Sequence, residues 1–194
     1  MPVIVAGARP PGVASRPARP TAKGIAMRHI ISISLQNEAG ALTRVAGLFS
    51  TRGYNIESLS VAPTDDPTVS RLTLVTTGND AVIHQIVSQL QKLVDVVAVD
   101  DMTRGAHFER EVALLKFRVG TKGIDALARL VTDVDGKILS GALDSFVVAL
   151  THSEADINHF IGQASQHAEL IEVVRSGALA IGQGARTLRH TATA

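Results

Sequence analysis

The sequence predicts an α+β fold of two tandem ferredoxin-like domains, each with the element order βαββαβ. Two observations support this fold class. From residue 27 onward, short segments with alternating apolar residues, typical of strands, are interleaved with segments whose apolar residues recur every three or four positions, typical of helices. The same order of segments recurs, more weakly, after a polar stretch around residues 104–110. A chain with this order forms a four-stranded antiparallel sheet with two helices on one face.

The first domain is expected to span residues 27–103. Its first strand begins at Met27, since isoleucine and leucine alternate with serine from Ile31 to Leu35. The helix that follows should end at Gly53, because glycine readily adopts the left-handed conformation found at helix C-termini. The remaining expected elements are strands at 55–62, 70–77 and 96–102, and a helix capped by Asn79 or Asp80.

The second domain is expected at residues 111–176, after a polar linker at 104–110. Its expected elements are strands at 112–119, 137–142, 145–151 and 170–175, and helices at 124–134 and 153–167. Each domain leaves one sheet face or edge uncovered, and such surfaces tend to pair with another chain. We therefore expect the protein to associate with a second copy or with a partner.

Both ends of the chain are expected to lie outside the two domains. Residues 1–26 contain five of the seven prolines and no acidic residue, a composition that predicts a disordered extension. An organelle transit peptide or an upstream start codon would give a similar composition, and the extension or upstream start is favoured. Residues 177–194 follow the last strand without a helical pattern, so a flexible tail is expected.

The composition excludes several classes of protein. The absence of cysteine excludes disulfides, cysteine-ligated metal sites and thiol nucleophiles. No segment approaches the roughly 20 consecutive apolar residues of a membrane span, so we expect a cytoplasmic protein without membrane contact. Residues 27–194 carry 15 basic and 18 acidic residues, and aromatic residues make up only 3% of the chain. Because of this net negative charge and the few aromatic residues, we expect no nucleic-acid partner.

The sequence contains no arrangement of residues typical of a catalytic or metal site. Three of the seven histidines, His152, His159 and His167, lie seven and eight positions apart, and no His-Glu-x-x-His motif occurs. Paired aspartates such as Asp65 and Asp66 flank predicted turns, where acidic residues are common. A Gly-x-Ser-x-Gly nucleophile motif is absent. We therefore expect a binding or regulatory protein with no catalytic residue and no metal ligand.

The segment from Asn37 to Leu42, just before the first helix, is the strongest candidate binding site. A helix N-terminus carries unpaired backbone N–H groups and a positive dipole end, which suit a carboxylate, and Gly40 allows close approach. Asn37 and Asn55 offer amide oxygens to an ammonium group. A simpler interpretation, which spacing alone favours, is that Asn37 caps the helix. Asparagine is unfavourable at the start of a strand, so Asn55 is either a turn residue or a residue kept for a polar contact.

Several motifs of this chain closely resemble the regulatory (small) subunit of acetolactate synthase, also called acetohydroxyacid synthase. They are Gly-Tyr-Asn-Ile-Glu-Ser-Leu at 53–59, Ala-Pro-Thr-Asp-Asp-Pro at 62–67, Gln-Lys-Leu-Val-Asp-Val-Val at 91–97 and Glu-Leu-Ile-Glu-Val-Val-Arg-Ser-Gly at 169–177. The first two motifs are highly specific to that family. The similarity extends over about residues 27–184 and is weaker between 120 and 166.

The resemblance implies an N-terminal ACT domain, which is a ferredoxin-like amino-acid sensor, and a C-terminal ACT-like domain. In that family two ACT domains pair side by side and bind valine at their interface. The implied contacts from one subunit are Asn37, Ala39, Gly40, Ala41 and Leu42, and those from the other are Asn55 and Ile56. Leu35 is a further candidate for the pocket lining. Valine, leucine and isoleucine share the same polar end, so the preferred amino acid stays open.

The resemblance also implies a role in branched-chain amino-acid biosynthesis. The chain would activate a separate catalytic subunit that condenses two pyruvates, or pyruvate with 2-oxobutyrate, and would make it sensitive to valine. Thiamine diphosphate, Mg²⁺ and often FAD are expected on that catalytic subunit and not on this chain. The alternative is a stand-alone ACT-domain sensor that regulates another metabolic enzyme. An RNA-recognition module shares the βαββαβ order, but the strand at 70–77 lacks the stacking aromatic residues of that module.

Overall fold

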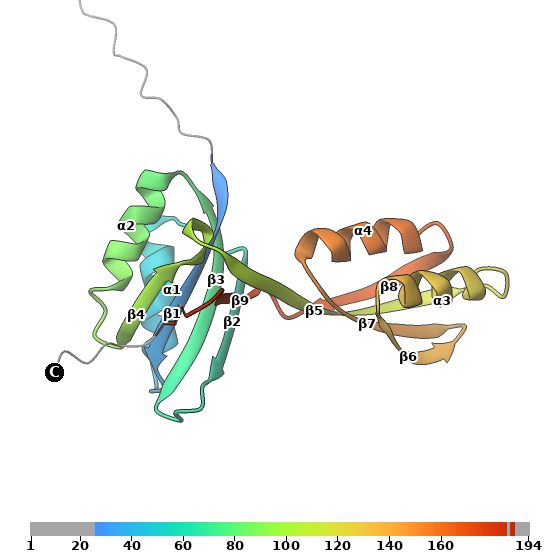
Figure 1. The fold of residues 1–194 in the computed structure, drawn as a ribbon, viewed down its shortest axis with the longest axis horizontal. Coiled ribbons are helices and arrows are strands. Elements are labelled where there is room, and N and C mark those ends of the chain that lie inside the picture. The colour runs from blue at the N-terminus through green and yellow to red at the C-terminus, as the bar shows by residue number, and fades with distance from the viewer. Residues whose placement is uncertain (1–25, 186, 189–194) are drawn as a thin grey trace, which may run out of the picture.

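The computed structural model describes residues 26–185 and 187–188. The disordered extension predicted at 1–26 therefore lies outside the described residues, apart from Ala26. Two βαββαβ domains follow one another along the chain, and each has two helices on one face of an antiparallel sheet (Figure 1). The predicted fold class is confirmed.

The N-terminal domain contains a four-stranded antiparallel sheet in the order β2-β3-β1-β4. Its elements are β1 (Met27–Gln36), α1 (Ala41–Arg52), β2 (Ser58–Pro63), β3 (Val69–Gly78), α2 (Asp80–Leu90) and β4 (Val96–Asp101), followed by the short 3-10 helix η1 (Met102–Arg104). In the centre of the sheet, Ile33 of β1 lies opposite Leu72 of β3 and Val99 of β4. Strand β2 forms one edge of the sheet and begins three residues later than predicted.

The core of the N-terminal domain lies between the sheet and its two helices. It is formed by alternate residues of the strands and by one apolar face of each helix, as the periodicity predicted. The fully buried members include Ile31, Ile33, Leu72, Leu74, Phe49, Ile83, Ile86 and Leu90. Ser32 and Ser34 lie on the opposite face of β1, yet they are also buried. Another part of the chain therefore covers that face.

The C-terminal domain has its main sheet in the order β6-β7-β5-β8. Its elements are β5 (His107–Val119), α3 (Ile124–Asp133), β6 (Lys137–Ala142), β7 (Ser145–His152), α4 (Glu154–Ala164), β8 (Ala168–Arg175) and β9 (Leu179–Gly182). Its core lies between this sheet and helices α3 and α4 and includes Phe117, Phe146 and Phe160. Helix α4 begins after Ser153, which caps it as predicted, but ends three residues before the predicted end.

Two expectations about the segments outside the domains are corrected. Residues 107–110, predicted to belong to a polar linker, form the start of β5, and residues 179–182, predicted to belong to a flexible tail, form β9. These segments pair with each other, with Arg110 opposite Leu179 and His107 opposite Gly182. The prediction was wrong because each segment has only four residues, too few to show an alternating pattern, and His107 to Arg110 are mostly polar as well. Pairing across about 70 residues of sequence stabilises both strands, and local patterns do not report such contacts.

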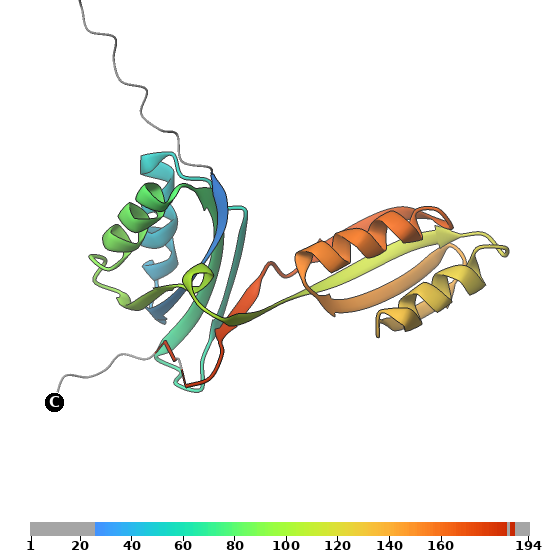
Figure 2. The same cartoon turned by 45° about the horizontal axis from the view of Figure 1, so that its top comes forward.

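The segment that contains β9 returns to the N-terminal domain and covers part of its open sheet face (Figures 1 and 2). Ala178 and Ala180 pack against Ile30, Val75 and Met102 of that domain. An ion pair joins the two domains as well, because Arg28 of β1 lies 2.5 Å from the carboxylate of Glu109. Apolar packing and charge therefore both join the two domains at this junction.

Within the described part of the chain, no helix is both long and apolar enough to cross a membrane.

Candidate functional site

The candidate loop lies between β1 and α1, at one end of the N-terminal domain. Asn37 and the residues up to Gly40 are exposed, and Leu42 is also exposed. Ala41 is 1% exposed and fixes the first turn of α1 against the core. Leu35, a further candidate for the pocket lining, is 2% exposed and belongs to the hydrophobic core. The loop is therefore exposed to solvent, while the buried residues Leu35 and Ala41 on either side of it anchor it to the hydrophobic core.

Helix α1 begins without a side-chain cap, so the interpretation of Asn37 as a helix cap is wrong. Gly40 occupies the N-cap position with φ of 87°, a left-handed conformation that favours glycine. Asn37 instead binds the hairpin between β2 and β3. Its Nδ2 donates to the carbonyl of Pro67 at 3.0 Å, and its backbone N–H donates to the carbonyl of Thr68 at 2.7 Å.

These contacts leave the amide oxygen of Asn37 available to a ligand. Within residues 26–185 and 187–188, no group donates a hydrogen bond to Asn37 Oδ1. The Nδ2 contact with Pro67 also fixes which end of the amide points away from the hairpin. Asn37 can therefore accept a hydrogen bond from an ammonium group, as its candidate role requires.

The first turn of α1 follows this loop and supplies backbone N–H donors. The N–H of Ala41 donates to the carbonyl of Glu38, and that of Arg44 donates to the carbonyl of Gly40. The N–H groups of Leu42 and Thr43 have no acceptor among the described residues. Unpaired N–H groups at a helix N-terminus attract an anion. The loop thus presents an acceptor and two donors, the complement of a zwitterionic amino acid.

An ion pair lies beside this turn and was not identified from the sequence. Arg44 of α1 donates through Nε and Nη2 to the two carboxylate oxygens of Asp95, which lies in the turn between α2 and β4. These hydrogen bonds hold the pKa of the Asp95 carboxyl below its usual value and raise the pKa of Arg44. The residues are 51 positions apart, so no local pattern in the sequence connects them.

Asn55 and Ile56 lie at the opposite end of α1. Both follow Gly53, the C-cap of this helix, whose φ of 68° confirms the predicted helix end. Asn55 is exposed, and its backbone carbonyl accepts a hydrogen bond from Thr76 Oγ1 at 2.6 Å. A helix of twelve residues is about 18 Å long. One chain therefore brings Asn37, Ala39, Gly40, Ala41 and Leu42 together but does not bring Asn55 or Ile56 to them.

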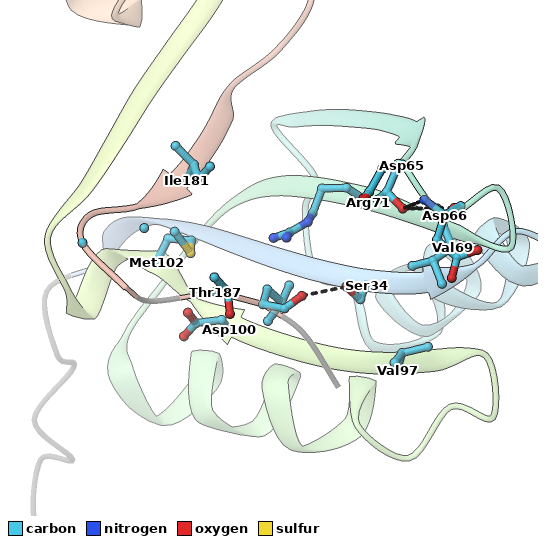
Figure 3. A pocket seen from close by; sticks show the side chains of 14 residues that line it. Ser34, Asp65, Asp66, Val69, Arg71, Val97, Asp100, Met102, Ile181 and Thr187 are labelled. Carbon is cyan, nitrogen blue, oxygen red and sulfur yellow. Dashed lines mark hydrogen bonds between the residues drawn. The ribbon is translucent and has the colours of Figure 1, made fainter. Parts of the chain in front are cut away.

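A cavity of about 540 Å³ lies elsewhere, on the sheet face of the N-terminal domain that is opposite its helices (Figure 3). Arg71 lies in this cavity and donates to Ser32 Oγ at 2.8 Å, and burial lowers the pKa of its guanidinium. The carbonyl of Leu188 accepts a hydrogen bond from Ser34 Oγ at 3.3 Å (Figure 3). None of the seven candidate site residues lines this cavity.

The described residues contain no group of three or more histidine, aspartate or glutamate side chains that could hold a metal ion.

Two family models match the chain. A model described as an AHAS small subunit-like ACT domain matches residues 31–98, and a model described as the small subunit of acetolactate synthase matches residues 110–184. The first match covers most of the N-terminal domain, and the second runs from the end of the expected linker through β9. Together the two matches cover both domains.

Curated relatives are similar to the chain over nearly the whole described range. The acetolactate synthase isozyme 3 small subunit of Escherichia coli is 44% identical over 163 residues, which is 84% of this chain and 100% of the relative. The acetolactate synthase small subunit of Haemophilus influenzae is 41% identical over 162 residues, covering 84% of this chain and 99% of the relative. The crystal structure of the acetolactate synthase small subunit from Thermotoga maritima has a TM-score of 0.73 at 31% identity, covering 81% of this chain and 98% of that chain.

Proposed function

The chain belongs to the family of acetolactate synthase small subunits, and from this membership we propose that it is the regulatory subunit of an acetolactate synthase. Its role would be to bind and activate a separate catalytic subunit. The observation that supports this most strongly is that 44% identity extends through both domains and covers a complete small subunit from Escherichia coli. A sensor domain that had been recruited to a different enzyme would have no reason to keep the second domain.

The proposed effector is valine, bound at the N-terminus of α1. Asn37 Oδ1 would accept a hydrogen bond from the ammonium group of the ligand, and the N–H groups of Leu42 and Thr43 would donate to its carboxylate. Ala39, Gly40 and Ala41 would bring the backbone close to the ligand. This arrangement is supported by the exposed loop, the uncapped helix and the unpaired groups on both sides of Gly40.

The proposed site is shared between two copies of the chain. Asn55 and Ile56 lie too far from Asn37 to contact the same small molecule within one chain. Both residues lie within three positions of the start of β2, an edge strand whose outer side has no neighbouring strand among the described residues. Pairing of two β2 edges around a two-fold axis would place Asn55 and Ile56 of one copy near the helix N-terminus of the other.

Regulation would operate through differential affinity. Valine can lower activity only if it binds more tightly to a dimer arrangement that activates the catalytic subunit less well. Coupling free energies of this kind are typically about 1–3 kcal/mol. We further propose that thiamine diphosphate, Mg²⁺ and FAD belong to the catalytic subunit, where pyruvate would condense with a second pyruvate or with 2-oxobutyrate.

The proposal is tested by reconstitution. The catalytic subunit from the same organism is purified alone, and its rate of acetolactate formation is measured as this chain is added in increasing amounts. The expected result is a saturable rise in rate together with co-elution of the two proteins on gel filtration. If the rate stays unchanged and the proteins do not co-elute, the proposal is wrong, and the alternative of an ACT-domain sensor for another metabolic enzyme takes its place.

A further inference from the structure

The guanidinium of Arg44 lies directly over the loop that precedes α1. Side chains of a helix point toward its N-terminus, and Arg44 follows this rule by extending back to Gly40. A Cβ atom placed on Gly40 would lie 3.0 Å from Nη1 of Arg44 and 3.9 Å from Nη2. Nη1 is therefore the guanidinium nitrogen nearest to the loop.

Asp95 fixes the orientation of this guanidinium. Its carboxylate accepts hydrogen bonds from Nε and from Nη2 of Arg44, the second at 2.7 Å. Asp95 is only 3% exposed, and its backbone carbonyl accepts from the N–H of Gln36 at 2.8 Å, at the end of β1. The carboxylate thus belongs to the rigid part of the domain, and it holds the planar guanidinium in one orientation.

The third guanidinium nitrogen, Nη1, is not held by Asp95. Among the residues that the structure describes, none accepts a hydrogen bond from Nη1 of Arg44. The other charged side chain that acts on Arg44 is the exposed carboxylate of Glu38, through its charge alone. Nη1 therefore presents two N–H donors and a positive charge at Gly40, the residue before the turn that carries the N–H groups of Leu42 and Thr43.

We propose that Arg44 binds the α-carboxylate of the amino-acid effector through Nη1, and that Asp95 is a positioning residue that aims Arg44 at the site. This inference rests on the proposed effector site and adds a residue to it. A carboxylate is the ligand that a guanidinium fork and helix N–H groups both favour. This arrangement requires glycine at position 40 for two reasons. The backbone there is left-handed, and a Cβ atom would occupy space next to Nη1 of Arg44.

The test measures binding of L-valine and of L-valinamide, which lacks the carboxylate charge, to the full chain by isothermal titration calorimetry. The variant is Arg44→Gln, and the matched control is Arg52→Gln. Arg52 lies in the last turn of the same helix, where it donates to Gln89 Oε1 at 3.1 Å. For Arg44→Gln, the Kd of valine should rise about 10- to 100-fold. The preference for valine over valinamide should fall about tenfold in the same variant, and Arg52→Gln should leave both values unchanged.

Three results would overturn the inference. An unchanged valine Kd in Arg44→Gln would remove Arg44 from the site, and equal weakening of valine and valinamide would show that the ion pair only supports the fold. In both cases the wild-type chain still binds valine, so the proposed function stands. A wild-type chain that binds no branched-chain amino acid would overturn the inference and the proposed effector together.

A second measurement on the wild-type chain covers the case in which Arg44→Gln does not fold. The Nε–H of Arg44 is held by Asp95 and should give a resolved side-chain resonance in a ¹⁵N-labelled sample. This resonance should shift when L-valine is added and should shift much less with L-valinamide. Equal shifts with the two ligands, or no shift with either at saturation, would also overturn the assignment.

Discussion

Asn37 connects the proposed effector site to the β2–β3 hairpin, because its Nδ2 donates to Pro67 while its Oδ1 faces away. In the variant Asn37→Ala, the ligand would lose one acceptor for its ammonium group, at a cost of about 1 kcal/mol. The valine concentration for half-maximal inhibition should therefore rise about fivefold, with activation retained. The measurement is an inhibition curve of the reconstituted enzyme.

The matched control for this variant is Asn158→Ala, since Asn158 is an exposed asparagine on α4 of the other domain. It should change neither activation nor inhibition. Loss of activation by Asn37→Ala with an unchanged valine response would contradict the assignment, because it would place Asn37 on the surface that binds the catalytic subunit.

Asp95 makes the stability of the N-terminal domain depend on pH. The hydrogen bonds from Arg44 hold the pKa of its carboxyl below the usual value. A lowered pKa means that the ionised form stabilises the folded state above the ordinary aspartate pKa of about 3.9, and that this contribution is lost as the pH falls through the lowered value. The difference in Tm between wild type and Asp95→Asn should therefore be largest near neutral pH and shrink in acid.

Thermal unfolding followed by circular dichroism from about pH 3 to pH 7 measures this difference. Asp65→Asn is the control, because Asp65 is exposed at the tip of the β2–β3 hairpin. A Tm difference for Asp95→Asn that grows as the pH falls would contradict the account.

At the scale of the elements, the segment that leads into β9 holds the two domains together through Ala178, the residue before this strand. Ala178 is 4% exposed and packs against Ile30, Val75 and Met102. The variant Ala178→Asp would place a carboxylate in this apolar contact at a cost of about 2–4 kcal/mol. Hydrogen exchange should then become faster at the amides of residues 107–110, which pair with β9, while β7 in the middle of its sheet stays protected. Ala155→Asp on the exposed face of α4 is the control. Unchanged exchange at 107–110 would show that β9 does not depend on this packing.

The elements that were predicted well are those whose apolar pattern is complete within the element itself. Strand β1 and helix α1 show complete periodic patterns, and Asn79 caps α2 by accepting from the N–H of Val82, as the sequence indicated. The start of α1 was not predictable in detail, because spacing made Asn37 a plausible cap. The structure instead starts the helix at a left-handed Gly40 and connects Asn37 to a hairpin 30 residues away.

The elements that were missed depend on contacts between distant segments. Strand β9 exists because β5 extends beyond its own sheet and leaves four residues to be paired. The Arg44–Asp95 pair spans two elements, and neither residue lies in a motif that indicates the other. The candidate site was inferred from the resemblance and from the sequence of the loop. Arg44 and Asp95, in contrast, could be connected to it only through the three-dimensional structure.

At the scale of the whole molecule, the separation of Asn37 from Asn55 by the length of α1 makes a prediction about subunit mixing. If each site takes Asn37 from one copy and Asn55 from the other, Asn37→Ala and Asn55→Ala chains should complement each other. In an equal mixture of the two chains, half of the dimers are mixed, and each mixed dimer keeps one intact site. About a quarter of all sites should then bind valine with wild-type affinity.

The two variant chains are co-expressed with different tags for this test, and valine binding is measured on the purified mixture and on each variant alone. Absence of any wild-type sites in the mixture would contradict a shared site. That result would mean that each site takes both asparagines from one chain, against the separation that the length of α1 gives them.

The most direct test of the central claim is a valine titration of the reconstituted enzyme. Acetolactate formation by the catalytic subunit is measured with a saturating amount of this chain and again without it, over a range of valine concentrations, with leucine and isoleucine in parallel. The account predicts that valine lowers the rate of the reconstituted enzyme toward that of the catalytic subunit alone and leaves the catalytic subunit alone unaffected. A reconstituted enzyme that is activated but insensitive to all three amino acids would contradict the account.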